Sequence, residues 1–501
     1  MNQVNNDFVT NEKDNNTTIL ETIEQENGSL LQKVHSNFKF FGGISLIFGV
    51  SYTTLFYKTM LGFNVLIFTA IMIILLISII KQLSLKVKGR TISYYVGALL
   101  LGASFLFVHS DVLLFFNIIG ILLLLDLSLL HQFYEIKEWD FLDYVSKVFL
   151  LPFTCISTIG MPFRDAFVFF QNIKILKNKT VRNIVIGLVI SMPLLGVIVG
   201  LLSHADLLFS RIFSDTFQLI FSSNIFSIII ITIVGFMICY CIICGALSKA
   251  GLEEKKKHQF KVDASIAITV LSLLTLVYII FCSIQILYLF GEGFFQLPSG
   301  ITFSEYARRG FYELLAVTAI NVFLMIISRK YFEDHKVIRI LLTLITTCTY
   351  IMIGSAAYRM FLYIDVYGLT FLRLLVLLFL LIDFFVLAGV ILYVFNSKFP
   401  LMHYCVVVMV ICYTLFAYAR PDYYIAKYQI EHQVEFTIAD ISYLTEELSL
   451  DAAPVVLPFL SELIEEDSLS KQAIKNMKER YLNRINSKKS SRGIRNFTLI
   501  Q

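Results

Sequence analysis

The stretch Thr302–Leu315, T-F-S-E-Y-A-R-R-G-F-Y-E-L-L, places several charged residues where a long apolar segment begins. Thr302 and Glu305 have the T-x-x-E spacing of a capping box, which predicts that a helix starts here. Charged groups at a membrane are costly unless they pair with one another or bind a ligand. The stretch therefore predicts a helix that enters a membrane with a functional or ion-paired polar end.

The composition of the whole chain is that of a membrane protein. Hydrophobic residues make up 57% of the 501 residues and charged residues 16%, against roughly 45–50% and about 25% in ordinary globular proteins. The apolar residues gather in runs close to the ~20 residues that cross the hydrocarbon core of a bilayer. The sequence therefore predicts an all-α, polytopic integral membrane protein. Eleven spans are expected, at residues 40–57, 61–80, 91–108, 112–132, 184–204, 225–247, 264–290, 311–328, 338–357, 369–395 and 402–419.

Polar segments divide these spans into groups. The sequence predicts a disordered tail at residues 1–39. Spans one to four follow at residues 40–132, and spans five to eleven at residues 184–419. Residues 133–183 predict a long cytoplasmic connection that lies on the membrane or re-enters it, because prolines, a glycine and the Arg164-Asp165 pair interrupt its apolar part. Residues 420–501 predict a small helical domain. Its helix starts are expected at Thr437, at Ser449 or Asp451, and at Ser468 or Ser470.

Basic residues predict the orientation of the chain. Lys and Arg gather in the short loops on one side of the expected spans, at positions such as Lys81, Lys88, Lys177, Lys256 and Arg329. That side is the cytoplasmic one by the positive-inside rule. The N-terminus is then cytoplasmic, and an odd number of spans places residues 420–501 outside. The basic residues of this last segment favour the inside, but the charge rule constrains long tails less.

With these eleven spans, ionisable residues of the last four spans are expected at one level of the outer leaflet. They are Glu305, Arg308, Arg309, Glu313, Arg359, Asp365, Arg373, Arg420 and Asp422. Two interpretations stay open. The residues form ion pairs and snorkelling arginines that fix helix ends, or they form an Arg-rich pocket for a phosphate, a carboxylate or a lipid head group, which the planar guanidinium binds bidentately.

Two acids lie deeper in the expected spans. Asp383 falls near the middle of span ten, and Asp126 falls in the inner half of span four. A carboxyl group inside a bilayer is protonated, paired with an arginine, or part of an ion or proton path. Both residues are therefore candidates for a coupled transport step.

Catalytic and cofactor motifs are absent from the sequence. It contains neither of the Gly-rich nucleotide-binding motifs, no H-E-x-x-H and no Cys/His cluster with metal-ligand spacing. Cys241 and Cys244 have C-x-x-C spacing, but they lie within an apolar run, where buried thiols behave as small hydrophobic residues. We therefore expect no cofactor, no metal site and no nucleic-acid partner, and the balance is against an enzyme.

Three motifs carry a resemblance to a known family. They are S-E-Y-A-R-R-G-F, then S-A-A-Y-R-M-F-L-Y-I-D-V-Y-G-L-T-x-x-R, then R-P-D-Y-Y-I-A-K-Y followed by Y-L-T-E-E-L-S-L-D-A-A-P. In this order, over about residues 302–458, they resemble a family of bacterial multi-span proteins filed as domain of unknown function 4173. The third motif departs from the family's usual N-x-D start, because Arg420 stands first. The resemblance implies a bacterial cytoplasmic membrane protein and brings no established activity.

These observations lead to one leading function and two rivals. The leading prediction is a non-catalytic sensing, accessory or partner-binding component, whose outer Arg/Glu level docks the C-terminal domain or an anionic envelope ligand. The first rival is a proton- or ion-coupled transporter that uses Asp383 or Asp126. The second is an envelope lipid or glycan transferase that uses Glu305 or Glu313 with the arginines. The expected partners are the lipid bilayer, an anionic lipid or envelope ligand, and another membrane protein.

Overall fold

The structure of the chain is a computed structural model that describes residues 30–134, 139, 141–171, 224–248, 261–290, 311–433, 435–465 and 471–490, with a few single residues between 187 and 206. Helices make up the regular structure of these residues. The one β-type contact among them is an isolated bridge between Val262 and Phe332. The predicted all-α fold is therefore confirmed.

Nine helices in the described part are long and apolar enough to cross a membrane. They are α2 (Phe38–Phe56), α3 (Phe63–Gln82), α5 (Asp111–Phe133), α10 (Asn224–Ser248), α11 (Ala264–Phe290), α13 (Phe311–Tyr331), α14 (Lys336–Tyr367), α15 (Phe371–Phe395) and α16 (Leu401–Tyr418). Each overlaps one of the eleven spans expected from the sequence. The chain is thus a multi-pass membrane protein.

The other two expected spans are not among these nine. The span at 91–108 corresponds to α4 (Gly89–Ser104), which is shorter than expected. The Ser104 hydroxyl donates to the carbonyl of Leu101 at 2.6 Å, and the chain turns at residues 105–107. Most of the span at 184–204 lies outside the described residues. The N-terminal tail is described from residue 30, where residues 30–36 are helical and lead directly into α2.

A bent helix pair occupies the ambiguous part of the expected connection. The helices α6 (Phe141–Ser157) and α7 (Met161–Gln171) meet at an angle of 44° across a three-residue break. Phe153 and Phe163 are exposed on this pair, whereas Asp165 is buried. Such a pair is either a broken span or a re-entrant loop, and counting it as one span raises the number of candidate spans in the described residues to ten.

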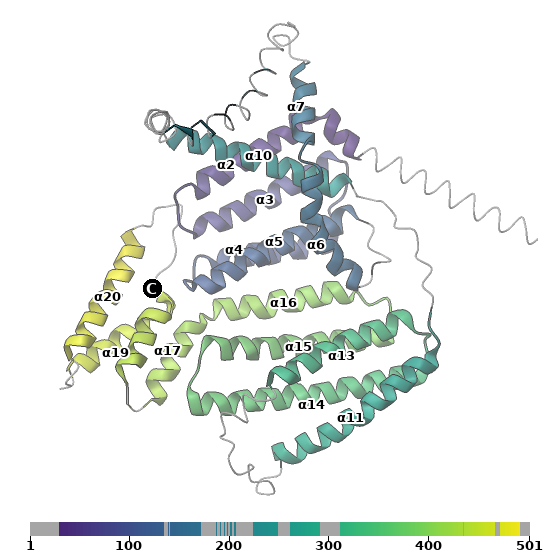
Figure 1. Cartoon of the computed structure of the whole chain (residues 1–501), viewed down its shortest axis with the longest axis vertical. Coiled ribbons are helices and arrows are strands. Elements are labelled where there is room, and N and C mark those ends of the chain that lie inside the picture. The colour runs from purple at the N-terminus through teal and green to yellow at the C-terminus, as the bar shows by residue number, and fades with distance from the viewer. Residues whose placement is uncertain are drawn as a thin grey trace, which may run out of the picture. The chain divides into compact units, whose positions relative to one another are not determined.

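The chain divides into two compact units, residues 1–95, 123–137 and 146–254 in the first and the remaining residues in the second. In the first unit α2 packs along α10 (Figure 1). Their backbones approach closely, because a Cβ atom on Gly235 would lie only 2.9 Å from the Cα of Gly49. The hydroxyls of Thr53 and Thr232 are 2.9 Å apart beside this crossing. Small residues permit such close contact between membrane helices.

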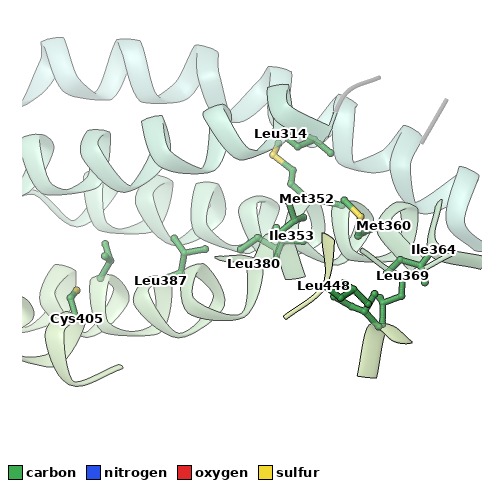
Figure 2. Close-up of a cluster of buried hydrophobic side chains, with 14 of the residues drawn as sticks. Leu314, Met352, Ile353, Met360, Ile364, Leu369, Leu380, Leu387, Cys405 and Leu448 are labelled. Carbon is green, nitrogen blue, oxygen red and sulfur yellow. The ribbon is translucent and has the colours of Figure 1, made fainter. Parts of the chain in front are cut away.

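The second unit contains a helical bundle with α14 at its centre. The helix α14 packs against α11, α13 and α15, and α15 packs against α16 (Figure 1). Buried side chains such as Met352, Leu380 and Leu387 form the core of this bundle (Figure 2). The same cluster continues through Leu369 to Leu448, which lies beyond the last span.

The residues after α16 fold into a group of short helices, here named the C-terminal cap. It consists of α17 (Pro421–His432), α18 (Ile438–Ser442), the π-helical turn η2 (Tyr443–Glu447), the 3-10 turn η3 (Leu450–Ala452), α19 (Ala453–Glu465) and α20 (Lys471–Ser490). Thr437 and Asp440 form a complete capping box at the start of α18, which confirms the helix start predicted there. The starts expected at Ser468 or Ser470 lie outside the described residues.

Candidate functional site

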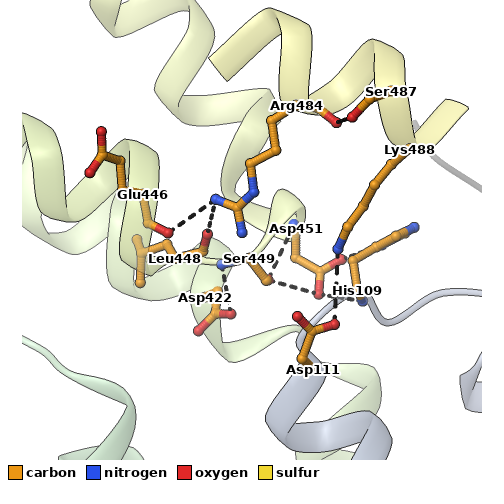
Figure 3. Close-up of polar contacts among 10 residues, drawn as sticks. All are labelled: His109, Asp111, Asp422, Glu446, Leu448, Ser449, Asp451, Arg484, Ser487 and Lys488. Carbon is orange, nitrogen blue, oxygen red and sulfur yellow. Dashed lines mark hydrogen bonds and ion pairs between the residues drawn. The ribbon is translucent and has the colours of Figure 1, made fainter. Parts of the chain in front are cut away.

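A buried polar cluster in the second unit joins the C-terminal cap to the loop that precedes α5 (Figure 3). We name this cluster the polar joint. Its members are His109, Ser110, Asp422, Ser449 and Asp451, and all five are buried. Residues more than 300 positions apart in the sequence therefore meet in one desolvated site.

Asp451 is the centre of the joint. Its carboxylate accepts a hydrogen bond from the backbone N–H of His109 at 2.9 Å and lies 2.7 Å from Nδ1 of the same residue. The side chain of His109 is only 5% exposed, and that of Asp451 only 1%. The Ser449 hydroxyl lies 3.3 Å from the same carboxylate. Bonds to a charged group in a dry site are stronger than neutral or exposed ones, so this contact holds the cap in place.

Asp422 is the second carboxyl group of the joint. It accepts from the backbone N–H of Ser449 at 3.2 Å and is also hydrogen-bonded to Ser110. Burial raises the pKa of Asp422, and the nearby charge of Asp451 raises it further, while the bonds from Ser449 and Ser110 oppose this shift. Pro421, the first residue of α17, has a φ suited to the first turn of a helix. The chain turns at Arg420, which has a φ of 53°.

The helix α20 closes the joint from the other side. The guanidinium of Arg484 donates to the carbonyls of Thr445, Glu446 and Leu448 at 3.1–3.2 Å, which satisfies the end of the π-helical turn. Lys488 lies 3.9 Å from the carboxylate of Asp111 (Figure 3). Both contacts tie α20 to the elements that carry the joint.

Tyr481 of α20 is buried beside these groups. Its hydroxyl has no hydrogen-bond partner among the described residues. Burial raises the pKa of Tyr481 to about 12; Arg484 lowers it, and Asp451 and Asp422 raise it. Such a hydroxyl loses its contacts with water on folding and gains none in return.

The structure describes some of the ionisable residues that the sequence predicted at the outer leaflet. Glu305, Arg308 and Arg309 lie outside the described residues. Glu313 is exposed in the first turn of α13. Arg359 is half-buried and donates to the side-chain oxygen of Gln285 on α11 at 3.0 Å.

Arg373 has a local structural role. It donates to the carbonyls of Tyr367 at 2.8 Å and of Gly368, and its guanidinium lies 4.2 Å from the ring centre of Tyr363. Gly368 has a φ of 77° at the end of α14, a backbone conformation that favours glycine. Arg373 thus binds the last carbonyls of α14, where a positive charge is favourable.

Three residues of the expected outer-leaflet level, Asp365, Arg373 and Asp422, influence the pKa of tyrosines in the cap. Burial raises the pKa of Tyr443, and the charge of Asp422 adds to this, whereas that of Arg373 lowers it. Burial likewise raises the pKa of Tyr428, with a contribution from Asp365, which is itself exposed. The structure therefore places Asp365, Arg373 and Asp422 around the cap, and Arg373 and Asp422 each have their own local contacts.

The two deep acids share one property. Asp126 in α5 and Asp383 in α15 each have a buried Oδ2 atom without a hydrogen-bond partner in the described part of the chain. The two acids belong to different units.

A further buried acid lies in the first unit. Asp165 of α7 accepts from the hydroxyl of Tyr240 on α10 at 2.8 Å and lies 2.5 Å from Nδ1 of His35. Arg164 also donates to it at 3.3 Å. The sequence singled out the Arg164-Asp165 pair as a polar interruption, but the carboxylate is 3% exposed and connects three segments.

Neither cysteines nor metal ligands form a site in the described residues. All eight cysteines are free and at least half-buried, as expected from their apolar surroundings. The described residues contain no group of three or more His, Cys, Asp or Glu side chains arranged to hold a metal ion.

The sequence did not single out several residues of this site. His109 belongs to no motif and is marked only by H-S-D at 109–111, a short polar interruption between two apolar runs. Ser449 and Asp451 were expected only to start a helix, and the Ser449 hydroxyl indeed accepts from the backbone N–H of Asp451 at 3.3 Å. Their additional contact with a loop more than 300 residues earlier leaves no local pattern.

Comparison with known proteins places the chain in a family. A family model described as a domain of unknown function (DUF4153) matches residues 95–458. This family carries a different number from the one that the motifs suggested, but it is of the same kind, and the match begins about 200 residues before those motifs. No curated protein and no solved structure matches the chain. Because the match covers well over half of its length, the chain belongs to the DUF4153 family.

Proposed function

We propose that this protein is a non-catalytic, partner-binding component of the bacterial cytoplasmic membrane, and that the C-terminal cap is its binding module. In this proposal the cap lies on the extracytoplasmic side. The observation that carries the proposal is the buried contact between His109 and Asp451, which fixes the cap to the loop before α5. A domain fixed in this way presents one defined surface to a partner.

The outward surface of α20 suits a partner with an acidic surface. Ile474, Tyr481 and Ile485 face inward and are buried. Basic residues occupy the exposed positions of the same helix, among them Lys471, Lys475, Arg480 and Lys489. Clustered positive charge attracts acidic protein surfaces and steers their association. We therefore expect a protein partner with an acidic patch.

Site-specific photo-crosslinking in intact cells tests this function. A photoreactive amino acid at Lys475 should yield one discrete protein adduct, whereas the same amino acid at the buried position Ile474 should yield none. The adduct from position 475 should disappear in the Asp451→Ala variant, because the cap is then released. Adducts with lipid alone, or an unchanged protein adduct in Asp451→Ala, would contradict the proposal.

The transporter remains a second candidate because of one observation, the buried Oδ2 atom of Asp383, which has no hydrogen-bond partner among the described residues. Uptake into proteoliposomes that depends on a proton gradient and fails in Asp383→Asn would favour it. The transferase has less support. Glu313 is exposed, and the described contacts of Arg359 and Arg373 include Gln285 and backbone carbonyls.

A further inference from the structure

The bent pair α6–α7, here named the elbow, has two different sides. Its outer side carries large apolar side chains at helical spacing, each between 42% and 68% exposed: Phe149, Phe153 and Ile156 on α6, and Phe163, Phe167 and Phe170 on α7. Its inner side carries the buried Thr154, Thr158 and Asp165. A surface helix in water turns its polar side outward. The elbow has the inverted arrangement, which fits a lipid environment on its outer side.

The inner side of α6 packs against α10. The hydroxyl of Thr158, directly after α6, lies within hydrogen-bond distance of two carbonyls, that of Cys155 at 3.0 Å and that of Cys241 on α10 at 3.1 Å. The helices approach closely, because a Cβ atom on Gly245 would lie 2.8 Å from Oγ1 of Thr154. These contacts fix which side of α6 faces the protein.

Asp165 fixes α7 beside α2 and α10. Its Oδ2 atom accepts from the phenol of Tyr240 on α10 at 2.8 Å and lies 2.5 Å from Nδ1 of His35, just before α2. The ring centres of Phe38 and Phe169 lie 5.4 Å apart. The helix α7 runs across α2 and α10 rather than along them (Figure 1). Its row of exposed phenylalanines is therefore turned away from both helices.

These contacts all fall at one end of α2 and α10. His35 and Phe38 stand at the start of α2. On α10 the contacts lie between Tyr240 and Gly245, and Tyr240 is eight residues before the end of the helix, or about 12 Å. The whole of α10 is about 37 Å long. The elbow thus follows α10 for about a third of its length and then reaches the start of α2, so it enters and leaves on the same side.

The exposed charges around this end are basic. Arg164 has 61% of its side chain exposed, next to Phe163. Its Nε donates to Asp165 at 3.3 Å, and its guanidinium makes no other hydrogen bond among the described residues. Lys33 and Lys39 are exposed near the start of α2. The terminal amino groups of an arginine bind a phosphate bidentately, so the charge of this end complements an anionic headgroup.

We propose that the elbow is a re-entrant segment seated in the headgroup region of the bilayer, and that Arg164 binds the phosphate of an anionic phospholipid there. The exposed phenylalanines lie among the upper parts of the acyl chains. Interfacial amphipathic helices bury their apolar side about 5–10 Å into this region, which agrees with contacts confined to the end of α10. This inference does not depend on the cap or on its partner, since it concerns the other compact unit.

Tryptophan fluorescence of the full chain in liposomes tests the depth of the elbow. The chain contains one tryptophan, Trp139, so Ile159→Trp in a Trp139→Phe background reports on the exposed break between α6 and α7. Bromine atoms on a lipid chain quench a nearby tryptophan. Bromine close to the headgroup should quench Ile159→Trp most strongly. Bromine at the end of the acyl chain should quench the reference Ile233→Trp, near the middle of α10, most strongly.

Two results of this measurement would overturn the elbow. Strongest quenching of Ile159→Trp by bromine at the end of the acyl chain would place the break at the centre of the bilayer, as in a full span. No quenching by either lipid would show that protein covers the break.

The variant Phe163→Trp in the same background tests the preference for an anionic lipid. In liposomes of phosphatidylcholine with brominated phosphatidylglycerol, its quenching should exceed that expected from the average composition. Adding Arg164→Gln should lower the relative affinity for phosphatidylglycerol about fivefold. The matched control Lys58→Gln, beyond the other end of α2, should leave it unchanged. An unchanged preference in Arg164→Gln, or an equal loss in Lys58→Gln, would overturn the assignment of the phosphate to Arg164.

Discussion

Removal of the Asp451 carboxylate should release the C-terminal cap. In Asp451→Ala, the backbone N–H and the ring of His109 lose their acceptor in a site where both side chains are at most 5% exposed. A bond to a charged group contributes about 1.5–3 kcal/mol, and breaking a buried pair costs about 3–5 kcal/mol. We expect the free energy of cap opening to fall by roughly 3–5 kcal/mol, which corresponds to a factor of roughly 10²–10³ or more in the opening equilibrium.

Hydrogen exchange of the cap amides in nanodiscs measures this equilibrium. The matched control is Glu446→Ala, which breaks an exposed pair with Arg480 at 3.6 Å and should change the free energy of opening by less than about 1 kcal/mol. A double-mutant cycle with His109→Ala isolates the pair, and the two substitutions should be clearly non-additive. If Asp451→Ala exchanges no faster than Glu446→Ala, or if the cycle is additive, the reasoning is refuted.

Three further predictions concern other contacts. Because the folded-state pKa of Asp422 is raised above its ordinary value of 3.8, protonation favours the docked cap. The protection of cap amides, taken relative to their intrinsic exchange rates at each pH, should therefore fall as the pH rises above about 4 through the raised pKa, and Asp422→Asn should lose this fall. Tyr481→Phe removes a buried hydroxyl without a partner in the described residues, so thermal unfolding should show equal or higher stability, by up to about 1–3 kcal/mol, and a clear loss would show that the hydroxyl has a partner. Gly49→Ala places a methyl group against the backbone of Thr232, which should cost about 1–3 kcal/mol in thermal unfolding, whereas Gly43→Ala, with open space around its Cβ position, should cost less than about 1 kcal/mol.

The membrane helices could be predicted because their signal is local. An apolar run of about 20 residues must be a helix in a bilayer, since every backbone polar group needs a partner within the segment. The capping box at Thr437 is equally local and was predicted correctly. The early end of α4 was missed because the apolar run continues through Phe107 and Val108, beyond the point where the helix ends at Ser104.

The polar joint could not be predicted because it depends on long-range packing. Asp422 was named among the candidates, but its partners, Ser110 and Ser449, belong to other elements. His109 and Asp451 each have an ordinary local context, and only the fold of the second unit brings them to 2.7 Å. The same holds for Arg373, which was expected in a ligand pocket and in the structure binds the end of α14.

The central claim is that the cap is fixed to the loop before α5, and a distance measurement tests it most directly. Spin labels at Asp111→Cys and Ser487→Cys, in a background without the eight native cysteines, report the separation of α5 and α20 in nanodiscs. Lys488 lies 3.9 Å from Asp111, so we expect a single short distance with a narrow distribution, which broadens in Asp451→Ala. A broad or long distribution in the labelled chain with Asp451 intact would contradict a docked cap.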